Sequence, residues 1–483
     1  MVSTLILNFD PLMAKSLTER DRQVIWHPYT QHKNQLPPIP ILQGKGSLLF
    51  DDRGNSYIDA ISSWWVTIHG HGHPYIAEKL YAQARQLEHV IFTGFTHEPA
   101  VQLAEKLLAI LPGDFSKVFY SDNGSTAVEV AIKMVLQYWQ NLEPGPGGGS
   151  AGTDPGAGQG YDREVGSTGA RGAQKVRNKI LAFRHSYHGD TFGAMSVSER
   201  SIFTAAFREH LFDVVFIDTP TADNIAGLQS FLRERAGEIA GFIYEPLLQA
   251  AGGMRIYDPV LMDSLLDTAR SGGILCIADE VLTGFGRTGR LFASEYLQHK
   301  ADIICLSKAL TGGTLALGVT AVTEPVFGAF LSDDRRRTFF HGHSFTANPL
   351  ACAAALASLD LLEREDCLSR IQNISRRHIE FGERIQKLPV VKNLRSLGTV
   401  LAFEINTGRD EYINSIGTAL TQEALQNGLY LRPLGNTVYL MPPYCITEKE
   451  MDQVYTFLVR YLESFQTAGA RSADGRAERI GDR

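Results

Sequence analysis

The sequence predicts an α/β fold in which helices cover a mainly parallel β-sheet. Short apolar runs alternate along the chain with segments of helical periodicity, and this alternation is typical of strands that are joined through helices. The predicted strands are residues 117–121, 179–183, 213–217, 240–244, 273–278 and 302–306, and the clearest helices between them are 127–139 and 259–270. Turn-rich strands and charged helices occupy both ends of the chain. We therefore expect a second, smaller α+β unit that is built from both termini.

These patterns divide the chain into a large domain, residues 62–363, and a small domain formed by residues 1–61 and 364–467. One segment of the large domain, residues 144–172, is dominated by glycine with several prolines and serines. Such a composition buries too little apolar surface to offset the entropy lost on ordering, so we expect a flexible surface insertion. Residues 468–483 are expected to form a disordered tail.

Composition and charge limit the class of function. The 483 residues are 44% hydrophobic and 20% charged, which is ordinary for a soluble protein with two substantial cores. A net charge of −7 argues against non-specific nucleic-acid binding and favours small-molecule partners. We find no secretory signal and no apolar run of membrane length, because residues 315–331 are interrupted by Glu324 and Pro325. Five widely spaced cysteines without a CxxC pair indicate reduced thiols in a cytoplasmic protein, and no metal site is predicted.

A single lysine, Lys308, follows the last predicted strand and precedes the glycine pair Gly312-Gly313. A lysine amine that is desolvated at the end of a buried strand can form a Schiff base with an aldehyde cofactor. Taken alone, a lysine at this position is more often a surface residue that reaches solvent. The cofactor interpretation therefore depends on other residues at the same edge of the sheet.

Two other strand ends carry residues that suit a cofactor. Gly124 and Ser125 lie where a strand turns into a helix, and free N–H groups at a helix start, with a nearby hydroxyl, bind phosphate. These residue types also cap helices without binding anything. Tyr187 follows the next predicted strand, in the region where open α/β sheets bind ligands, and its ring could stack on a flat cofactor or simply fill the core.

The most informative acidic residue is Asp279, which ends a wholly apolar strand. A buried carboxylate is costly unless it meets a cation or strong hydrogen-bond donors. A protonated pyridine nitrogen is such a cation, and holding its charge would keep the ring an electron sink. The spacing between Asp279 and Lys308 leaves room for a helix and one further strand, so both side chains are expected at the same sheet edge.

Together these motifs resemble the class III, fold-type I pyridoxal-phosphate aminotransferases. The resemblance covers nearly the whole chain outside the glycine-rich segment and the tail, and it implies a seven-stranded, mainly parallel sheet. It also implies that Lys308 forms the Schiff base with pyridoxal 5'-phosphate, and that Asp279 pairs with the pyridinium nitrogen. Gly124 and Ser125 would hold the phosphate, and Tyr187 would stack on the ring. The motifs that carry the resemblance are Gly124-Ser125, Tyr187-His188-Gly189, Glu245-Pro246, Ala278-Asp279-Glu280, residues 284–289 and Ser307-Lys308.

Residues 26–30, 62–70, 187–196 and 431–435 resemble one branch of this family more narrowly. That branch acts in biotin synthesis, where it transfers the amino group of S-adenosylmethionine to 8-amino-7-oxononanoate and gives 7,8-diaminononanoate. The resemblance implies that Lys308, Asp279 and Tyr29 are catalytic. It places a further set of residues at the substrate, with Arg432 meeting the carboxylate of the acceptor: Tyr29, Trp64, Tyr187, Asp190, Arg432 and Tyr439. Aromatic walls from Tyr29, Trp64 and Trp65 suit an aliphatic chain and a sulfonium or adenine group alike.

The amino donor is argued from two replaced residues. Members of the class that use glutamate usually carry an arginine where this chain has Tyr439, and a glutamate where it has residues 250–253, Ala-Ala-Gly-Gly. A phenol cannot grip a carboxylate as a guanidinium does, so the pocket suits a donor other than glutamate. Lysine as the donor, another ω-aminotransferase activity, and a cofactor-binding scaffold without turnover stay open as alternatives.

A late segment, residues 341–349, predicts the assembly. In the family, a hydroxyl at the position of Ser344 reaches the phosphate of the neighbouring subunit, and the resemblance places His343 beside it and Gly342 beside the substrate. Relatives often have Pro-Thr or His-Thr in place of His343-Ser344, and Gly in place of Ala347. The resemblance therefore implies a homodimer with active sites at the interface.

Overall fold

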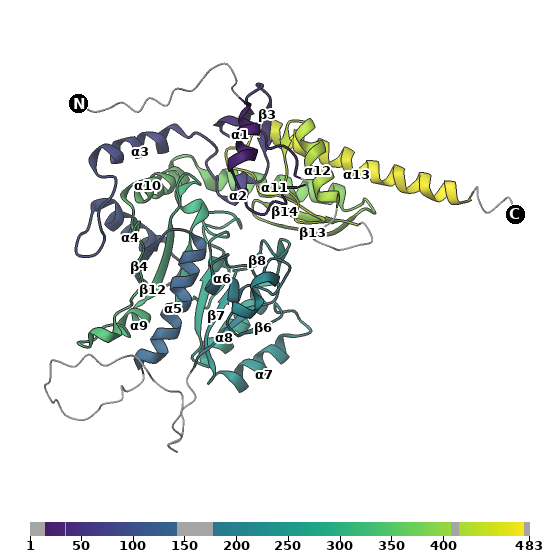
Figure 1. Ribbon diagram of the computed structural model, residues 1–483. Helices are drawn as coiled ribbons and strands as arrows, with labels where there is room; N and C mark the ends of the chain where they lie inside the picture. Colours follow the sequence, from purple (N-terminus) through teal and green to yellow (C-terminus); the bar gives the residue numbers. More distant parts are fainter. Residues whose placement is uncertain (1–14, 34, 143–176, 407–414, 478–483) are drawn as a thin grey trace, which may run out of the picture.

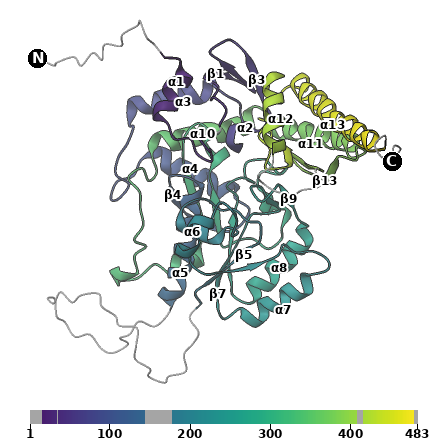
Figure 2. The same cartoon turned by 45° about the vertical axis from the view of Figure 1, so that its right-hand side comes forward.

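The computed structural model describes residues 15–33, 35–142, 177–406 and 415–477 (Figure 1). The glycine-rich segment 144–172 and the last residues of the chain, 478–483, lie outside these ranges. Figures 1 and 2 show the central sheet with α5, α7 and α8 in one part of the molecule, and α1, α12 and α13 with the smaller sheets in the other.

The central sheet has seven strands, as the resemblance implies, in the order β4-β12-β11-β10-β7-β5-β6. Strands β6, β5, β7, β10 and β11 pair in parallel, whereas β12 is antiparallel to both β11 and β4. All six predicted strands are confirmed, and the seventh, β12, comes from the apolar region after residue 315. Their bounds are β4 Phe115–Ser121, β5 Lys179–Phe183, β6 Val214–Ile217, β7 Ile239–Tyr244, β10 Leu275–Asp279, β11 Ile303–Leu306 and β12 Gly318–Thr323.

Both faces of this sheet are covered, which explains why its strands are apolar at nearly every position. On one face, side chains such as Ile243 and Ile303 pack against α5 (Gly124–Leu142). On the other face, Phe242 and Ile304 belong to a second, larger core, to which α8 (Pro259–Ser271) and α4 (Glu98–Ile110) contribute. The predicted helices 127–139 and 259–270 correspond to α5 and α8. The remaining helices of this part are α3 Pro74–Gln86, α6 Phe192–Val197, α7 Ile225–Arg235, α9 Glu324–Gly328 and α10 Pro349–Arg364.

The two ends of the chain meet in one small sheet. Strand β15 (Leu429–Tyr430) pairs in parallel with β3 (Ser56–Asp59), and β1 (Ile41–Lys45) and β2 (Leu48–Asp51) complete the order β1-β2-β3-β15. A second sheet, β13-β14-β16, comes entirely from the later part of the chain. Its strands and the neighbouring elements are β13 Val391–Leu397, β14 Val400–Ile405, β16 Thr437–Leu440, α1 Leu17–Val24, α2 Ser62–Trp65, α11 Cys367–Ile385 and α12 Ser415–Gln426. A short hairpin, β8 (Leu248–Gln249) with β9 (Arg255–Ile256), follows β7.

The last helix differs from the expectation of a disordered tail. Helix α13 runs Glu448–Ala477, so the structure is helical through residues 468–477. The exact division into a large and a small domain stays a prediction. Among the described residues, no helix is long and apolar enough to cross a membrane. Four cysteines are buried and free, and the fifth, Cys445, is free and partly buried.

Candidate active site

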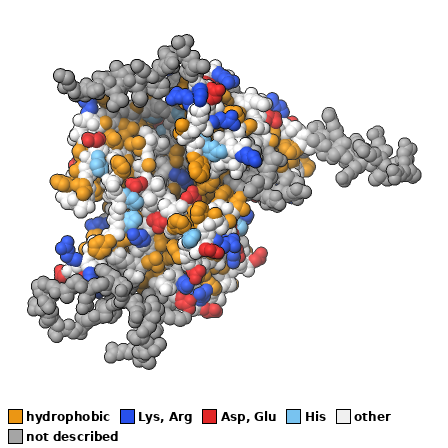
Figure 3. Space-filling model, viewed as in Figure 1, with side chains coloured by type: hydrophobic (Ala, Val, Ile, Leu, Met, Phe, Trp, Pro, Cys, Tyr) orange, Lys and Arg blue, Asp and Glu red, His pale blue; other side chains and the backbone are white. Residues whose placement is uncertain are grey.

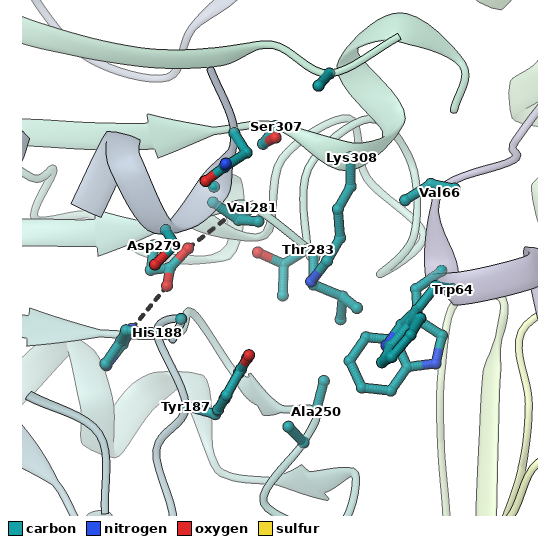
Figure 4. A pocket seen from close by; sticks show the side chains of 18 of the residues that line it. Trp64, Val66, Tyr187, His188, Ala250, Asp279, Val281, Thr283, Ser307 and Lys308 are labelled. Atoms are coloured by element: carbon teal, nitrogen blue, oxygen red, sulfur yellow. Dashed lines mark hydrogen bonds and ion pairs between the residues drawn. The ribbon is translucent and has the colours of Figure 1, made fainter. Parts of the chain in front are cut away.

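A cavity of about 540 Å³ opens at the carboxyl ends of the parallel strands, where ligands of open α/β sheets bind. Five strand ends supply its lining: Ser125 follows β4, Tyr187 follows β5, Glu245 follows β7, Asp279 ends β10 and Lys308 follows β11. The prediction that Asp279 and Lys308 emerge at one sheet edge is therefore confirmed. In Figure 4 the Lys308 side chain extends into the cavity between the Asp279–His188 pair on one side and Trp64 on the other.

Lys308 begins a short 3-10 helix, Lys308–Thr311, with a left-handed backbone of φ 45°. This conformation is strained for a residue other than glycine, and such strain is typical of functional sites. The Nζ atom lies 5.1 Å from the centroid of the Trp65 ring. Burial lowers the pKa of Lys308, while the nearby carboxylates of Asp279 and Glu245 act against this shift. The amine is thus a cavity group, and the surface interpretation is wrong.

Asp279 is 5% exposed and is held by two donors. Its Oδ2 lies 2.7 Å from Nδ1 of His188, and its Oδ1 accepts a hydrogen bond of 3.1 Å from the Val281 N–H. The Nε2 atom of His188 is buried and has no hydrogen-bond partner among the described residues. These contacts fix the carboxylate at the cavity and leave it able to meet a cationic ligand atom.

The start of α5 is arranged for an anion as well as for its own capping. Asn123 supplies the cap, because its Oδ1 accepts from the Thr126 N–H at 3.0 Å. Ser125 is therefore not needed as a cap, and its Oγ instead accepts from the Thr191 N–H at 3.0 Å, at the rim of the cavity. A Cβ on Gly124 would lie 2.5 Å from Val281 Cγ1, and one on Gly189 would lie 2.3 Å from Ser125 Oγ. Only glycine allows this close approach.

Aromatic side chains from distant segments close the cavity. Tyr29 donates a 2.5 Å hydrogen bond to Asp190 and lies 3.4 Å, oxygen to oxygen, from Tyr187. Its ring packs edge-on against Trp64 at 5.7 Å, and the Arg432 guanidinium lies 4.4 Å from the centroid of the same indole. Burial, together with hydrogen bonding to Tyr29, raises the pKa of Tyr187. The structure thus brings together Tyr29, Trp64, Tyr187, Asp190 and Arg432, five of the seven residues predicted at the substrate.

Tyr439 lies behind this aromatic group rather than at its surface. It is 3% exposed, and its hydroxyl accepts a 2.9 Å hydrogen bond from Nε1 of Trp65. A small adjoining cavity of about 70 Å³ is lined by Tyr29, Trp64, Tyr439 and Arg432, among others. The predicted role of Tyr439 at the substrate therefore includes positioning the Trp65 ring that faces Lys308.

The predicted residues of the late segment, Gly342, His343 and Ser344, do not line this cavity. Gly342 and Ser344 are exposed, while His343 Nδ1 lies 3.0 Å from a carboxylate oxygen of Asp122. The prediction for these residues concerns a neighbouring subunit, and the single chain does not test it. Across the described ranges, no group of three His, Cys, Asp or Glu side chains is placed to hold a metal ion.

Among the residues that line the cavity, His188 and Glu245 had no predicted role, and Trp65 was expected only as part of the aromatic lining of the substrate pocket. Glu245 carried the same signal as Asp279, since it also follows a wholly apolar strand. His188 and Trp65 stood inside motifs, but their partners, Asp279 and Tyr439, lie far away in the sequence. Ala251 belongs to the stretch 250–253 that served in the argument about the amino donor, but the sequence did not predict its place in the lining of the cavity.

Known proteins agree with this geometry. The family profile "Aminotransferase class-III" matches residues 29–462. The chain is 44% identical to an adenosylmethionine-8-amino-7-oxononanoate aminotransferase of Synechococcus elongatus, over 91% of this chain and 98% of the relative. It is 37% identical to the enzyme of the same name from Geobacter sulfurreducens, over 93% and 97%.

Solved structures give the same result. An adenosylmethionine-8-amino-7-oxononanoate aminotransferase from Methanocaldococcus jannaschii superposes with a TM-score of 0.82 at 32% identity, covering 93% of this chain and 98% of the other. An omega transaminase from Pseudomonas jessenii, solved in complex with PMP, gives 0.81 at 25% identity with the same coverage. With the cavity and its lysine in place, the match over nearly the full length shows that the chain is an aminotransferase of the class III family.

Proposed function

We propose that this aminotransferase uses pyridoxal 5'-phosphate to move the amino group of S-adenosylmethionine to 8-amino-7-oxononanoate, giving 7,8-diaminononanoate for biotin synthesis. The observation that carries the proposal is the placement of Lys308 and the Asp279–His188 pair on one cavity. The shared name of the relatives and of one solved structure supports the choice of substrates. A scaffold without turnover would have no need of a strained, partly buried lysine facing that pair.

The residues present fit the proposed cofactor. The glycine contacts at Gly124 and Gly189 leave room that a Cβ would fill, beside the Ser125 hydroxyl, and this suits a phosphate. Asp279 would meet the ring nitrogen, and Tyr187 would cover the ring. When bound, pyridoxal phosphate supplies an aldehyde that reacts with amines and a ring that withdraws electrons from the reacting carbon.

The chain's own groups supply the proton transfers and the electrostatics. Burial lowers the pKa of Lys308 Nζ, so the amine gives up its proton more readily than an exposed lysine does, which suits a group that must act as general base and acid. Asp279 places a fixed negative charge at the cavity, and His188 Nδ1 and the Val281 N–H hold it in orientation. Trp65 lies against the amine and shields it from water. General acid–base catalysis of this kind contributes about 10²–10⁴-fold to a rate.

The substrate side of the cavity must accept two unlike molecules in turn. Tyr29 and Trp64 present aromatic faces that suit both an aliphatic chain and a sulfonium or adenine group. Arg432 would bind the carboxylate of the acceptor with its guanidinium, which stacks on Trp64. Tyr439, buried against Trp65, stands where a guanidinium would be expected to grip glutamate.

The proposed assembly is a cytoplasmic homodimer in which the late segment of each subunit completes the cavity of the other. Phe340 and Phe345 on this segment are 73% and 62% exposed, which favours burial against a protein surface. Gly342, His343 and Ser344 lie between them and would reach the neighbouring site. On the face drawn in Figure 3, Lys and Arg are interspersed with Asp and Glu, so small charged substrates suit this chain better than a polyanion.

A single-turnover experiment tests the donor. The purified protein loaded with pyridoxal phosphate is mixed with S-adenosylmethionine, lysine or glutamate, and conversion to the amine form of the cofactor is followed by absorbance. Rapid conversion by S-adenosylmethionine alone is expected. Conversion by lysine but not by S-adenosylmethionine would instead assign the alternative donor, with the same acceptor or as another ω-aminotransferase.

A further inference from the structure

Glu245 lines the cavity beside Lys308, yet the reaction described above gives it no role. It follows β7 directly and is 6% exposed. A carboxylate at this depth is costly unless strong donors meet it, so its partners indicate what it does.

Two backbone N–H groups from different loops donate to this one carboxylate. The Tyr187 N–H donates to Oε1 at 3.0 Å, and the Ala250 N–H donates to Oε2 at 3.1 Å. The first loop, residues 184–190, follows β5, and the second, residues 247–253, follows β7. Glu245 therefore joins the two loops at the edge of the cavity.

Further contacts hold the same loops together away from the cavity. Gln249 is buried, and its side-chain amide donates to the Arg184 carbonyl at 2.7 Å. A Cβ on Gly252 would lie 2.0 Å from the His185 carbonyl oxygen, so only glycine lets the loops come this close. We call Glu245 and these two loops, residues 184–190 and 247–253, the Glu245 clamp.

Each loop carries one wall of the proposed ligand site. Tyr187 stands in the first loop, where it would cover the cofactor. Ala251 stands in the second, next to the residue that Glu245 binds, and it lines three adjoining cavities of about 540, 560 and 70 Å³. A shift of the second loop would therefore change the space that all three cavities offer to the substrates.

We propose that Glu245 is a positioning residue, which sets the Tyr187 wall and the Ala251 wall relative to each other by accepting hydrogen bonds from both loops. The identity of the ligands that meet these walls rests on the proposed function. The clamp itself is a property of the chain without ligand.

Amide hydrogen exchange on the ligand-free, full-length protein tests the clamp. Glu245→Ala is expected to speed exchange by roughly tenfold or more in peptides from both loops, because both N–H groups lose their hydrogen-bond acceptor. Glu245→Gln keeps one carbonyl oxygen, so exchange should rise in one loop only, and this variant decides the test if the alanine variant does not fold. Unchanged exchange in both loops of the folded variants would overturn the proposal.

The matched control is Glu280→Gln. Glu280 is also fully buried and accepts from two backbone N–H groups, those of Ala293 and Ser294, but it does not line the cavity. This variant should lower the thermal midpoint and leave exchange in the two clamp loops at the wild-type rate. Equal acceleration of both loops in the control would show general loosening and would contradict a specific clamp.

Titration with pyridoxal phosphate completes the test. The dissociation constant of the cofactor should rise by about tenfold in Glu245→Ala, since the wall that covers it is no longer fixed. Faster exchange with unchanged cofactor affinity would refute the positioning role. If the wild-type chain bound no pyridoxal phosphate, the proposed function would fail, while the exchange data would still decide on the clamp.

Discussion

The two walls of the active-site cavity are built in different ways. One, which we call the sheet wall, comes from the carboxyl ends of strands of the central sheet and carries Gly124, Asp279 and Lys308. The other, the aromatic wall, is assembled from both ends of the chain and consists of Tyr29, Trp64, Arg432 and Tyr439. On the sheet wall each residue is placed by the end of the strand that it ends or follows, and Asp279 is held further by His188. On the aromatic wall, residues far apart in sequence are fixed by one another.

This difference suggests a division of labour, in which the sheet wall would carry out the chemical steps and the aromatic wall would select the substrates. In the proposed mechanism the sheet wall carries the acid–base and electrostatic groups at the ends of buried strands, where they can be held in fixed positions. The aromatic wall would meet the parts of the two proposed substrates that differ, so a change there should leave the reacting atoms undisturbed. Trp65 contacts both walls, because its ring faces Lys308 while its Nε1 donates to Tyr439.

The strongest way to break the sheet wall is Lys308→Ala. We expect turnover to fall by on the order of 10⁴-fold or more, because the proposed general base and the proposed attachment point of the cofactor are lost together. The visible absorbance of the bound cofactor should change as well, and thermal unfolding should confirm that the variant is folded. Turnover near the wild-type rate would refute the mechanism.

The second test of the sheet wall is Asp279→Asn, which keeps the shape and removes the charge. A loss of about 10²–10³-fold in kcat is expected, typical of removing one preorganised electrostatic contact. Asp302→Asn is the control: Asp302 lies at the opposite end of the neighbouring strand, where it accepts from the Cys276 N–H at 2.7 Å, outside the cavity. That variant should lose stability and keep kcat, and equal kcat losses would contradict the assignment.

The pH dependence of the free energy of unfolding tests whether the carboxyl group of Glu245, beside the sheet wall, is buried in the folded protein. Burial is the main cause that raises its pKa from 4.5 to about 7, with the Asp279 charge adding to it and His188 opposing it. A raised pKa means that the folded state favours the protonated form of Glu245. The stability that this protonation contributes to the folded state is fully present below pH 4.5 and is lost as the pH rises through about 7.

Compared with Glu245→Gln, the wild type should therefore lose about 3 kcal/mol of unfolding free energy between pH 4.5 and 8, because each tenfold difference in proton affinity between the folded and unfolded states corresponds to roughly 1.4 kcal/mol. Urea denaturation of both proteins across this range measures the difference. If the unfolding free energies of the wild type and of Glu245→Gln changed in parallel with pH, Glu245 would not have the raised pKa described here.

On the aromatic wall, Arg432→Met should weaken binding of the acceptor without changing the chemical step. We expect the KM for 8-amino-7-oxononanoate to rise by about 10–100-fold, since a charge-assisted hydrogen bond contributes about 1.5–3 kcal/mol. The rate of the donor half-reaction, measured in a single turnover, should stay within a few-fold of the wild type. A slow donor half-reaction with unchanged KM would place Arg432 on the donor instead.

The same division explains what could be predicted from the sequence. Lys308 and Asp279 were predictable because a polar residue at the end of an apolar strand is costly, and this signal is local. Glu245 carried the signal too, but its role depends on two loops that only the fold brings together. The contact between Tyr29 and Asp190 joins residues 161 positions apart and could be expected only from the resemblance. The places of Gly342, His343 and Ser344 depend on a second chain.

The mildest change, Tyr29→Phe, sharpens the comparison because it removes one oxygen and keeps the ring. It deletes the hydrogen bond to Asp190 and leaves the packing on Trp64 in place. If Tyr29 mainly shapes the aromatic wall, kcat/KM should fall by about tenfold or less, the equivalent of about 1 kcal/mol for one hydrogen bond. Tyr29→Ala, which also removes the ring, should cost clearly more. A loss for Tyr29→Phe as large as that for Asp279→Asn would instead show that the phenol takes part in the chemistry, and the aromatic wall would then share the function of the sheet wall.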